Sequence, residues 1–162
     1  MGSPTTEQAY KHSDLVIQGR VIGIDTIQSS NKIMFDKKGI KVGRHRYSIY
    51  SENFLRVKMV VEKSFKLIPN LPDTIYVLTN LESDACGYPF LPFFDGVSPG
   101  RYQYIVYATS WVEKTIIKIK KGKRNLGQIK ELQLKDTFFT NTCNKTQPVN
   151  KEGLKNLSTL TE

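Results

Sequence analysis

Two cysteines are the most reactive side chains of this sequence, and they lie far apart in the chain. Cys86 is found in the stretch ACGY, and Cys143 in the stretch TNTCNKT. A catalytic cysteine needs a neighbouring base and a lowered thiol pKa. The only histidines are His12, in a segment that reads as a helix, and His45, in a basic stretch. Neither adjoins a cysteine in the sequence, so a Cys–His catalytic pair is not favoured.

A metal site or an acid–base pair has equally little support. A zinc site needs about four ligands at close spacing, whereas the cysteines and histidines are scattered. The sequence contains no HExxH, Walker A or GxGxxG motif. Glu82, Asp84 and Asp95 lie near Cys86 in the sequence, but carboxylates in loops are usually only solvated. The sequence therefore predicts a protein that is not an enzyme and needs no metal or cofactor.

Positive charge is the strongest bias of the composition, with a formal net charge of +9. Such charge either keeps a surface soluble or attracts a nucleic acid, an anionic polysaccharide or an acidic protein. Aromatic residues between 102 and 111 either stack on bases or fill the core; they are Tyr102, Tyr104, Tyr107 and Trp111. Two stretches are rich in lysine and arginine. They contain Lys32, Lys37, Lys38, Lys41, Arg44 and Arg46, then Lys114, Lys118, Lys120, Lys121, Lys123 and Arg124.

The elements that would position these side chains are mostly strands. Residues 53–67 alternate, with Leu55, Val57, Met59 and Val61 on one face, which predicts a half-buried strand. The polar, glycine-bearing residues 28–46 read as a long loop or a floppy hairpin, and residues 86–100 as a structured loop. Further strands are predicted at 14–24, 73–81, 101–111, 114–124 and 136–143, with a short helix at 4–13 and an amphipathic helix at 148–160 that begins at Pro148.

These elements predict the fold class. Strands that come in runs, without helices between them, argue against a parallel βαβ sheet. We expect a mainly β fold, a five-stranded OB-like closed barrel with flanking N- and C-terminal helices. In such a barrel the two basic stretches fall in loops that OB folds use for oligonucleotides and sugars. We take residues 1–4 as a cloning scar and residues 5–162 as a single domain.

Five stretches come in the order and spacing of a known module: SDLVIQGRVIGI, VKMVVEKSFKL, ACGYPF, GRYQYIVYA and FFTNTCNKT. From about Ala9 to Thr146 the chain resembles the netrin-like module, and most of all the N-terminal domain of tissue inhibitors of metalloproteinases. The resemblance implies an OB barrel flanked by helices and a protein partner such as a metalloprotease. It also implies an exported protein, secreted or held in the cell envelope. A membrane would be reached only through a lipid anchor of the kind that a bacterial relative carries.

The resemblance implies a structural role for Cys86 and Cys143. Family members begin Cys-x-Cys, and those two cysteines bond to the positions that match Cys86 and Cys143. Here no cysteine precedes Cys86, and we take the leading pair to lie upstream of this chain. Because cysteines two residues apart are about 7 Å apart in an extended chain, the two thiols are expected within roughly 15 Å of each other, free or paired.

The resemblance also implies a partner-binding edge next to the lost disulfide, formed by Thr5, Thr6, Glu7, Tyr10, Asp84, Ala85 and Gly87. In these inhibitors the amino group and carbonyl of the first cysteine chelate the zinc of the protease. This chain has Met1 in that place, so we do not expect strong inhibition. The alternative is a basic OB domain that binds single-stranded nucleic acid or an anionic polysaccharide through Lys37, Lys38, Lys41, Arg44, Arg46, Lys120, Lys121, Lys123 and Arg124.

Overall fold

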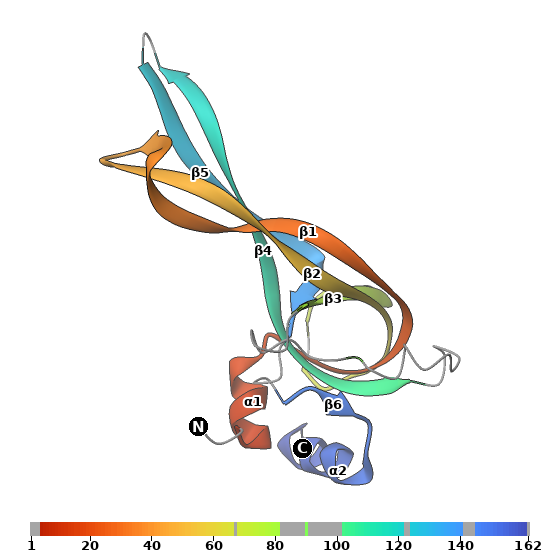
Figure 1. The fold of residues 1–162 in the computed structure, drawn as a ribbon. Helices are drawn as coiled ribbons and strands as arrows, with labels where there is room; N and C mark the ends of the chain where they lie inside the picture. The colour runs from red at the N-terminus through yellow and green to blue at the C-terminus, as the bar shows by residue number, and fades with distance from the viewer. Residues whose placement is uncertain are drawn as a thin grey trace. The chain divides into compact units, whose positions relative to one another are not determined.

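The computed structural model describes residues 4–66, 68–81, 90, 102–121, 124–140 and 145–161, with the backbone alone at 31, 121 and 124–126 (Figure 1). Within these residues the chain is mainly β, as the sequence predicts, with a helix near each end. The elements are α1 (Thr6–His12), β1 (Leu15–Val42), β2 (His45–Ser64), β3 (Thr74–Asn80), β4 (Gln103–Lys121), β5 (Arg124–Phe139), β6 (Gln147–Pro148) and α2 (Lys151–Thr161). Neither α1 nor α2 is long and apolar enough to cross a membrane.

Pairing between neighbouring strands connects five of them into a ring. The order is β1-β2-β3-β5-β4, and β4 pairs back with β1. The β1–β4 and β2–β3 pairs are antiparallel, whereas β3 and β5 run parallel, with Tyr76 opposite Thr137. The short strand β6 joins β4 on the other side. Each strand of the ring thus pairs with two others of the ring, and β4 pairs with β6 as well, so none of the five is an edge strand along its whole length.

The chain divides into two compact units. Unit 1 comprises Met1–Ile27, Phe54–Trp111 and Lys135–Glu162, and unit 2 comprises Gln28–Asn53 and Val112–Leu134. The strands β1, β2, β4 and β5 each contribute residues to both units. Unit 2 therefore consists of two hairpin segments, one from β1 and β2 and one from β4 and β5.

Unit 1 is built on strands that are buried on both faces. In β1, Leu15 and Ile17 belong to one apolar cluster and Val16 to a second, because successive side chains of a strand point to opposite faces. The first cluster draws buried side chains from all five strands of the ring, with Phe90 packed edge-on to Tyr104. It includes Val57 and Met59, with Leu55 and Val61 packed against it, which confirms the face predicted for residues 53–67.

The second cluster lies between the sheet and the two helices. It combines Val16, Ile105 and Tyr107 with Ala9 of α1 and Leu157 of α2. The start of α1 is fixed by a capping box, in which the Thr5 hydroxyl accepts from the Gln8 N–H and the Gln8 side chain accepts from the Thr5 N–H. The predicted helices at both ends of the chain are therefore present, and each buries an apolar face.

Three predicted elements differ from the structure. Of the two alternatives for residues 28–46, the hairpin is confirmed and the long loop is wrong, because β1 runs through Val42 and only residues 43 and 44 form the turn to β2. The strand at 136–143 begins much earlier, at Arg124, and ends at Phe139. Pro148 does not begin a helix: it pairs with Tyr104 in β6. Instead, the Asn150 side chain accepts from the Gly153 N–H at 2.7 Å, at the start of α2.

Burial of Tyr107 gives a test of this core. Its side chain is fully buried, its hydroxyl has no hydrogen-bond partner in the described part of the chain, and burial raises the pKa of Tyr107 to about 12. Tyr107→Phe removes an unsatisfied polar atom without leaving a cavity. We expect the free energy of unfolding, measured by urea denaturation, to stay constant or rise by up to about 1 kcal/mol. A loss of about 1 kcal/mol or more would show that the hydroxyl is bonded.

Candidate functional site

An open groove with a volume of about 620 Å³ lies within unit 2. Its walls come from the end of β1, the start of β2, Lys118 of β4 and Gly127 of β5. Four of its lining residues are basic, and none is acidic: Lys38, Lys41, Arg46 and Lys118. A ligand in this groove would therefore meet positive charge from both hairpin segments.

A second concavity of about 350 Å³ adjoins the first and shares Lys41 and Arg46 with it. Its other lining residues are Phe35, Lys37, Arg44 and His45. We call the two concavities together the cationic groove. It is lined by six lysines and arginines, namely Lys37, Lys38, Lys41, Arg44, Arg46 and Lys118.

Two glycines allow the backbone to form this groove. Gly43 adopts a φ of +61° in the turn between β1 and β2, a left-handed conformation that glycine adopts without steric cost. Gly127 brings β5 against β1: a Cβ at this position would lie 2.8 Å from both the Lys41 carbonyl oxygen and the Ile40 side chain. The hairpin segments of unit 2 therefore approach each other at a point where only a hydrogen atom fits.

None of the groove cations forms an ion pair with a carboxylate of the described residues. The ion pairs found among the described residues of unit 2 are Lys32–Glu52 and Lys114–Glu131, and none of these four residues lines the groove. Arg46 donates from Nη1 to the Gly39 carbonyl at 3.0 Å, which orients the guanidinium without neutralising it. Its charge, like that of Lys41, remains available to an anion.

Asp36 is the acidic residue closest in sequence to the groove cations, and its oxygens are already engaged. Oδ1 accepts from the Lys38 N–H at 2.9 Å, and Oδ2 accepts from the Ser48 hydroxyl at 2.5 Å. These bonds, the one from Ser48 first, hold the pKa of Asp36 below its usual range. The carboxylate thus stays charged, but it serves the local hairpin and does not line the groove.

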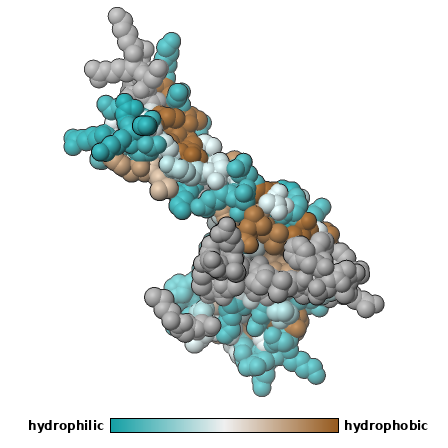
Figure 2. Space-filling model, in the orientation of Figure 1, coloured by the Kyte–Doolittle hydropathy of each residue, from teal (hydrophilic) through white to brown (hydrophobic). Residues whose placement is uncertain are grey.

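Aromatic rings stand beside the cations. Phe35, His45 and Tyr47 form a chain of edge-to-face contacts, with Phe35 5.6 Å from His45 and 6.1 Å from Tyr47 between ring centroids. The Phe35 side chain is 62% exposed. In the space-filling view, a group of hydrophobic residues lies beside hydrophilic residues on the surface of unit 2 (Figure 2). Other exposed large apolar residues of this unit are Met34, Tyr50, Ile119 and Leu132.

Charge is divided very unequally between the two units. Unit 2 contains 13 Lys and Arg against 4 Asp and Glu, whereas unit 1 contains 11 of each. The formal charge of unit 2 is therefore +9, and that of unit 1 is zero. The whole net charge of the chain belongs to the two hairpin segments that form the groove.

The structure brings together six of the twelve basic residues that the sequence singled out. Lys37, Lys38, Lys41, Arg44 and Arg46 all line the cationic groove, although they lie on strands and a tight turn instead of a long loop. From the second basic stretch, Lys118 joins them, and the exposed Lys120 lines neither concavity. Lys123 and the side chains of Lys121 and Arg124 lie outside the described residues.

Of the two roles considered for the aromatic residues between 102 and 111, the structure supports filling the core and not stacking on bases. Tyr104, Tyr107 and Trp111 are buried in unit 1, and Tyr102 packs partly buried against its core. The aromatic residues at the groove are Phe35 and Tyr47, which lie in the stretch predicted as a loop or hairpin. The sequence signal for them is the concentration of aromatic and basic residues on both sides of Gly43.

The cysteines and part of the partner-binding edge cannot be placed. Cys86, Cys143, Asp84, Ala85 and Gly87 all lie outside the described residues. Thr5 and Glu7 are exposed at the start of α1 and Thr6 is half-buried. Tyr10 instead packs inward, with its hydroxyl donating to the Phe65 carbonyl at 2.8 Å.

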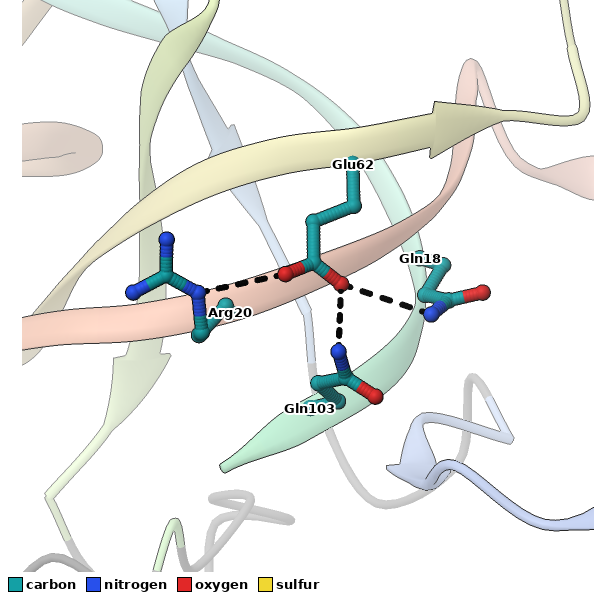
Figure 3. Close-up of polar contacts among 4 residues, drawn as sticks. All are labelled: Gln18, Arg20, Glu62 and Gln103. Carbon is teal, nitrogen blue, oxygen red and sulfur yellow. Dashed lines mark hydrogen bonds and ion pairs between the residues drawn. The ribbon is translucent and has the colours of Figure 1, made fainter. Parts of the chain in front are cut away.

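Outside the cationic groove, the described residues contain few groups of side chains that could bind a metal or act as acid and base. No group of three or more His, Cys, Asp or Glu that could hold a metal ion is found there. His12 and His45 belong to different units. The most connected carboxylate is Glu62, which accepts from Arg20 at 3.1 Å, Gln103 at 2.8 Å and Gln18 at 3.3 Å (Figure 3). Both its oxygens are engaged, so it joins β1, β2 and β4 instead of serving as a free base.

Comparison with protein families and with curated proteins finds no match for this chain. The groove geometry and the charge distribution therefore carry the functional argument by themselves.

The contact at Gly127 can be tested by substitution. Gly127→Ala forces a methyl group against the Lys41 carbonyl and Ile40, and we expect it to lower the free energy of unfolding by about 1–3 kcal/mol. The entropic gain of replacing glycine, about 0.4–1 kcal/mol, is smaller. Gln128→Ala, at the exposed neighbouring position, is the control and should be nearly neutral. Equal denaturation midpoints for both variants would contradict the close approach.

Proposed function

We propose that this chain is a non-enzymatic binding module whose unit 2 binds a polyanion, a nucleic acid or an anionic polysaccharide, through the cationic groove. The observation that carries the proposal is the charge distribution: unit 2 holds the entire +9 of the chain. Six of its lysines and arginines line two adjoining concavities that share Lys41 and Arg46.

The physical basis is counterion release. A polyanion condenses small cations around itself, and lysines and arginines that contact its phosphates or sulfates return those cations to solution. Interactions between exposed charges act over about 8 Å at physiological ionic strength, so cations lining one groove act on the same short stretch of ligand. Because the groove cations have no carboxylate partner in the described part of unit 2, binding breaks no ion pair.

We further infer that the five-strand ring is a closed barrel of the OB type. The closed order of pairing, a core cluster drawn from all five strands and a helix near each end support this inference. OB folds present oligonucleotide- and saccharide-binding surfaces, which is consistent with the proposed class of ligand. The proposal assigns no catalytic step to the chain.

A second proposal is an exported netrin-like module that binds a protein, such as a metalloprotease, through the N-terminal residues Thr5–Tyr10. It is supported by the placement of strand ends. β3 and β5 are parallel neighbours, and Cys86 and Cys143 follow them by six and four residues. Lys145 also donates to the Pro4 carbonyl at 3.4 Å, so the N-terminal segment lies close to a residue that comes two positions after Cys143 in the sequence.

Salt dependence tests polyanion binding. We expect the wild-type protein to bind both heparin and a single-stranded oligonucleotide at low salt, in a fluorescence anisotropy or calorimetric titration. For the oligonucleotide, six phosphate contacts predict a slope of log K against log salt of about −4, since single strands release about 0.7 counterion per contact. The variant Lys37→Glu/Lys41→Glu should lose most of the affinity for both ligands.

The matched control is Lys151→Glu/Lys155→Glu, which changes the net charge equally at exposed positions of α2 in unit 1. It should weaken binding much less than the groove variant. Equal losses would mean that net charge alone, and not the groove, attracts the ligand. Absence of binding to either polyanion at low salt would refute the proposal.

Thiol chemistry tests the second proposal. If Cys86 and Cys143 lie within about 15 Å, a short bis-maleimide should link them within one molecule, as mass spectrometry of the digested protein would show. A native disulfide, seen as the absence of free thiols before reduction, would support the same placement. Two free thiols that each form only a single adduct would contradict it.

A further inference from the structure

The cationic groove carries more than charge, because an exposed aromatic ring stands among its cations. Phe35 lines the same concavity as Lys37, Lys41 and Arg44, and 62% of its side chain is exposed. Charge attraction to the sulfates or carboxylates of a polysaccharide uses only the cations. A large apolar ring held in water beside them has no role in simple charge attraction.

The geometry of the rings leaves Phe35 open to a planar partner. Its contacts with His45 and Tyr47 are edge-to-face, with interplanar angles of 62° and 83°. Neither neighbour lies parallel to the ring, so neither takes the place of a stacked base. These contacts also restrain Phe35 beside the cations, since offset and edge-to-face pairs contribute about 0.5–1.5 kcal/mol.

We propose that the groove binds single-stranded nucleic acid, with phosphates on the groove cations and a base stacked on Phe35. This inference rests on the proposed polyanion binding and names its ligand class. Single-stranded nucleic acid combines a phosphate chain with unpaired bases, and proteins bind it through a positive groove that follows the backbone and aromatic rings on which bases stack. The contact uses the π-face that every base has, so it is tolerant of sequence.

The test distinguishes the contribution of the phosphates to the binding affinity from the contribution of the bases. The ligands are an oligothymidylate of about 16 nucleotides, the upper site size for one OB fold, an abasic deoxyribose-phosphate oligomer of the same length, and a heparin fragment. The two oligomers carry the same charge and differ only in the bases. We expect the oligothymidylate to bind at least about 5-fold more tightly than the abasic oligomer, because one stacked base contributes that much or more.

Substitution of Phe35 should remove the difference in affinity between the oligothymidylate and the abasic oligomer, and should leave the other affinities unchanged. Phe35→Ala is expected to lower oligothymidylate affinity to the abasic level, while affinities for the abasic oligomer and for heparin stay within about 2-fold, since the phosphate contacts persist. Phe35→Trp should restore the difference. Tyr50→Ala is the matched control: Tyr50 is an exposed aromatic residue of unit 2, 44% accessible, that does not line the groove. It should leave all three affinities unchanged.

Several results would overturn the inference while leaving polyanion binding intact. They are equal affinities for the two oligomers, a loss at Phe35→Ala that is the same for all three ligands, and binding of heparin without the oligothymidylate. Binding of phosphatidylserine vesicles without either oligomer would instead assign the exposed ring to a lipid surface and also overturn it. If no ligand binds at low salt, the proposed function itself fails. Unchanged thermal midpoints would show that each variant folds.

Discussion

Repulsion between like charges on neighbouring strands is the constraint that shapes unit 2. Two unit charges 4 Å apart in water repel by about 1 kcal/mol, and unit 2 collects 13 basic and only 4 acidic residues on two hairpin segments. A net charge far from zero destabilises a compact state. Unit 1 is neutral by the same count, so the excess is confined to the two hairpin segments. Polyanion binding, as proposed, would make use of this excess.

Uncharged contacts offset the repulsion within the hairpins. Gly127 lets β5 approach the backbone of β1, the Phe35–His45–Tyr47 contacts join the two strands beside the turn, and Arg46 is held by a carbonyl instead of a carboxylate. None of these interactions neutralises a groove cation. The groove is thus maintained with its charges unpaired, and an anionic ligand would lower the repulsion and stabilise the folded state by mass action. Fold and proposed function depend on the same property.

Two kinds of element could be predicted from the sequence: a strand with one apolar and one charged face, and a helix whose start carries a local cap. Val57 and Met59 alternate with charged residues, so the strand around them could be recognised, and Thr5 with Gln8 marks the start of α1. The sequence could not reveal the full length of β1, because Gly39, Gly43 and the surrounding lysines are typical of a loop. Nor could it predict that Phe35 is exposed and Tyr107 buried. Their exposure depends on contacts between distant strands, which no local pattern encodes.

Hydrogen–deuterium exchange of the free and ligand-bound protein tests the central claim most directly. Exchange reports local opening of the backbone residue by residue, so it locates the ligand without a mutation. With a saturating single-stranded oligonucleotide, the account predicts slowed exchange in peptides from 28–53 and 112–134, and little change in peptides from the helices and the remaining strands. Protection confined to α1 and its neighbours, or binding without any protection in the two hairpin segments, would contradict it.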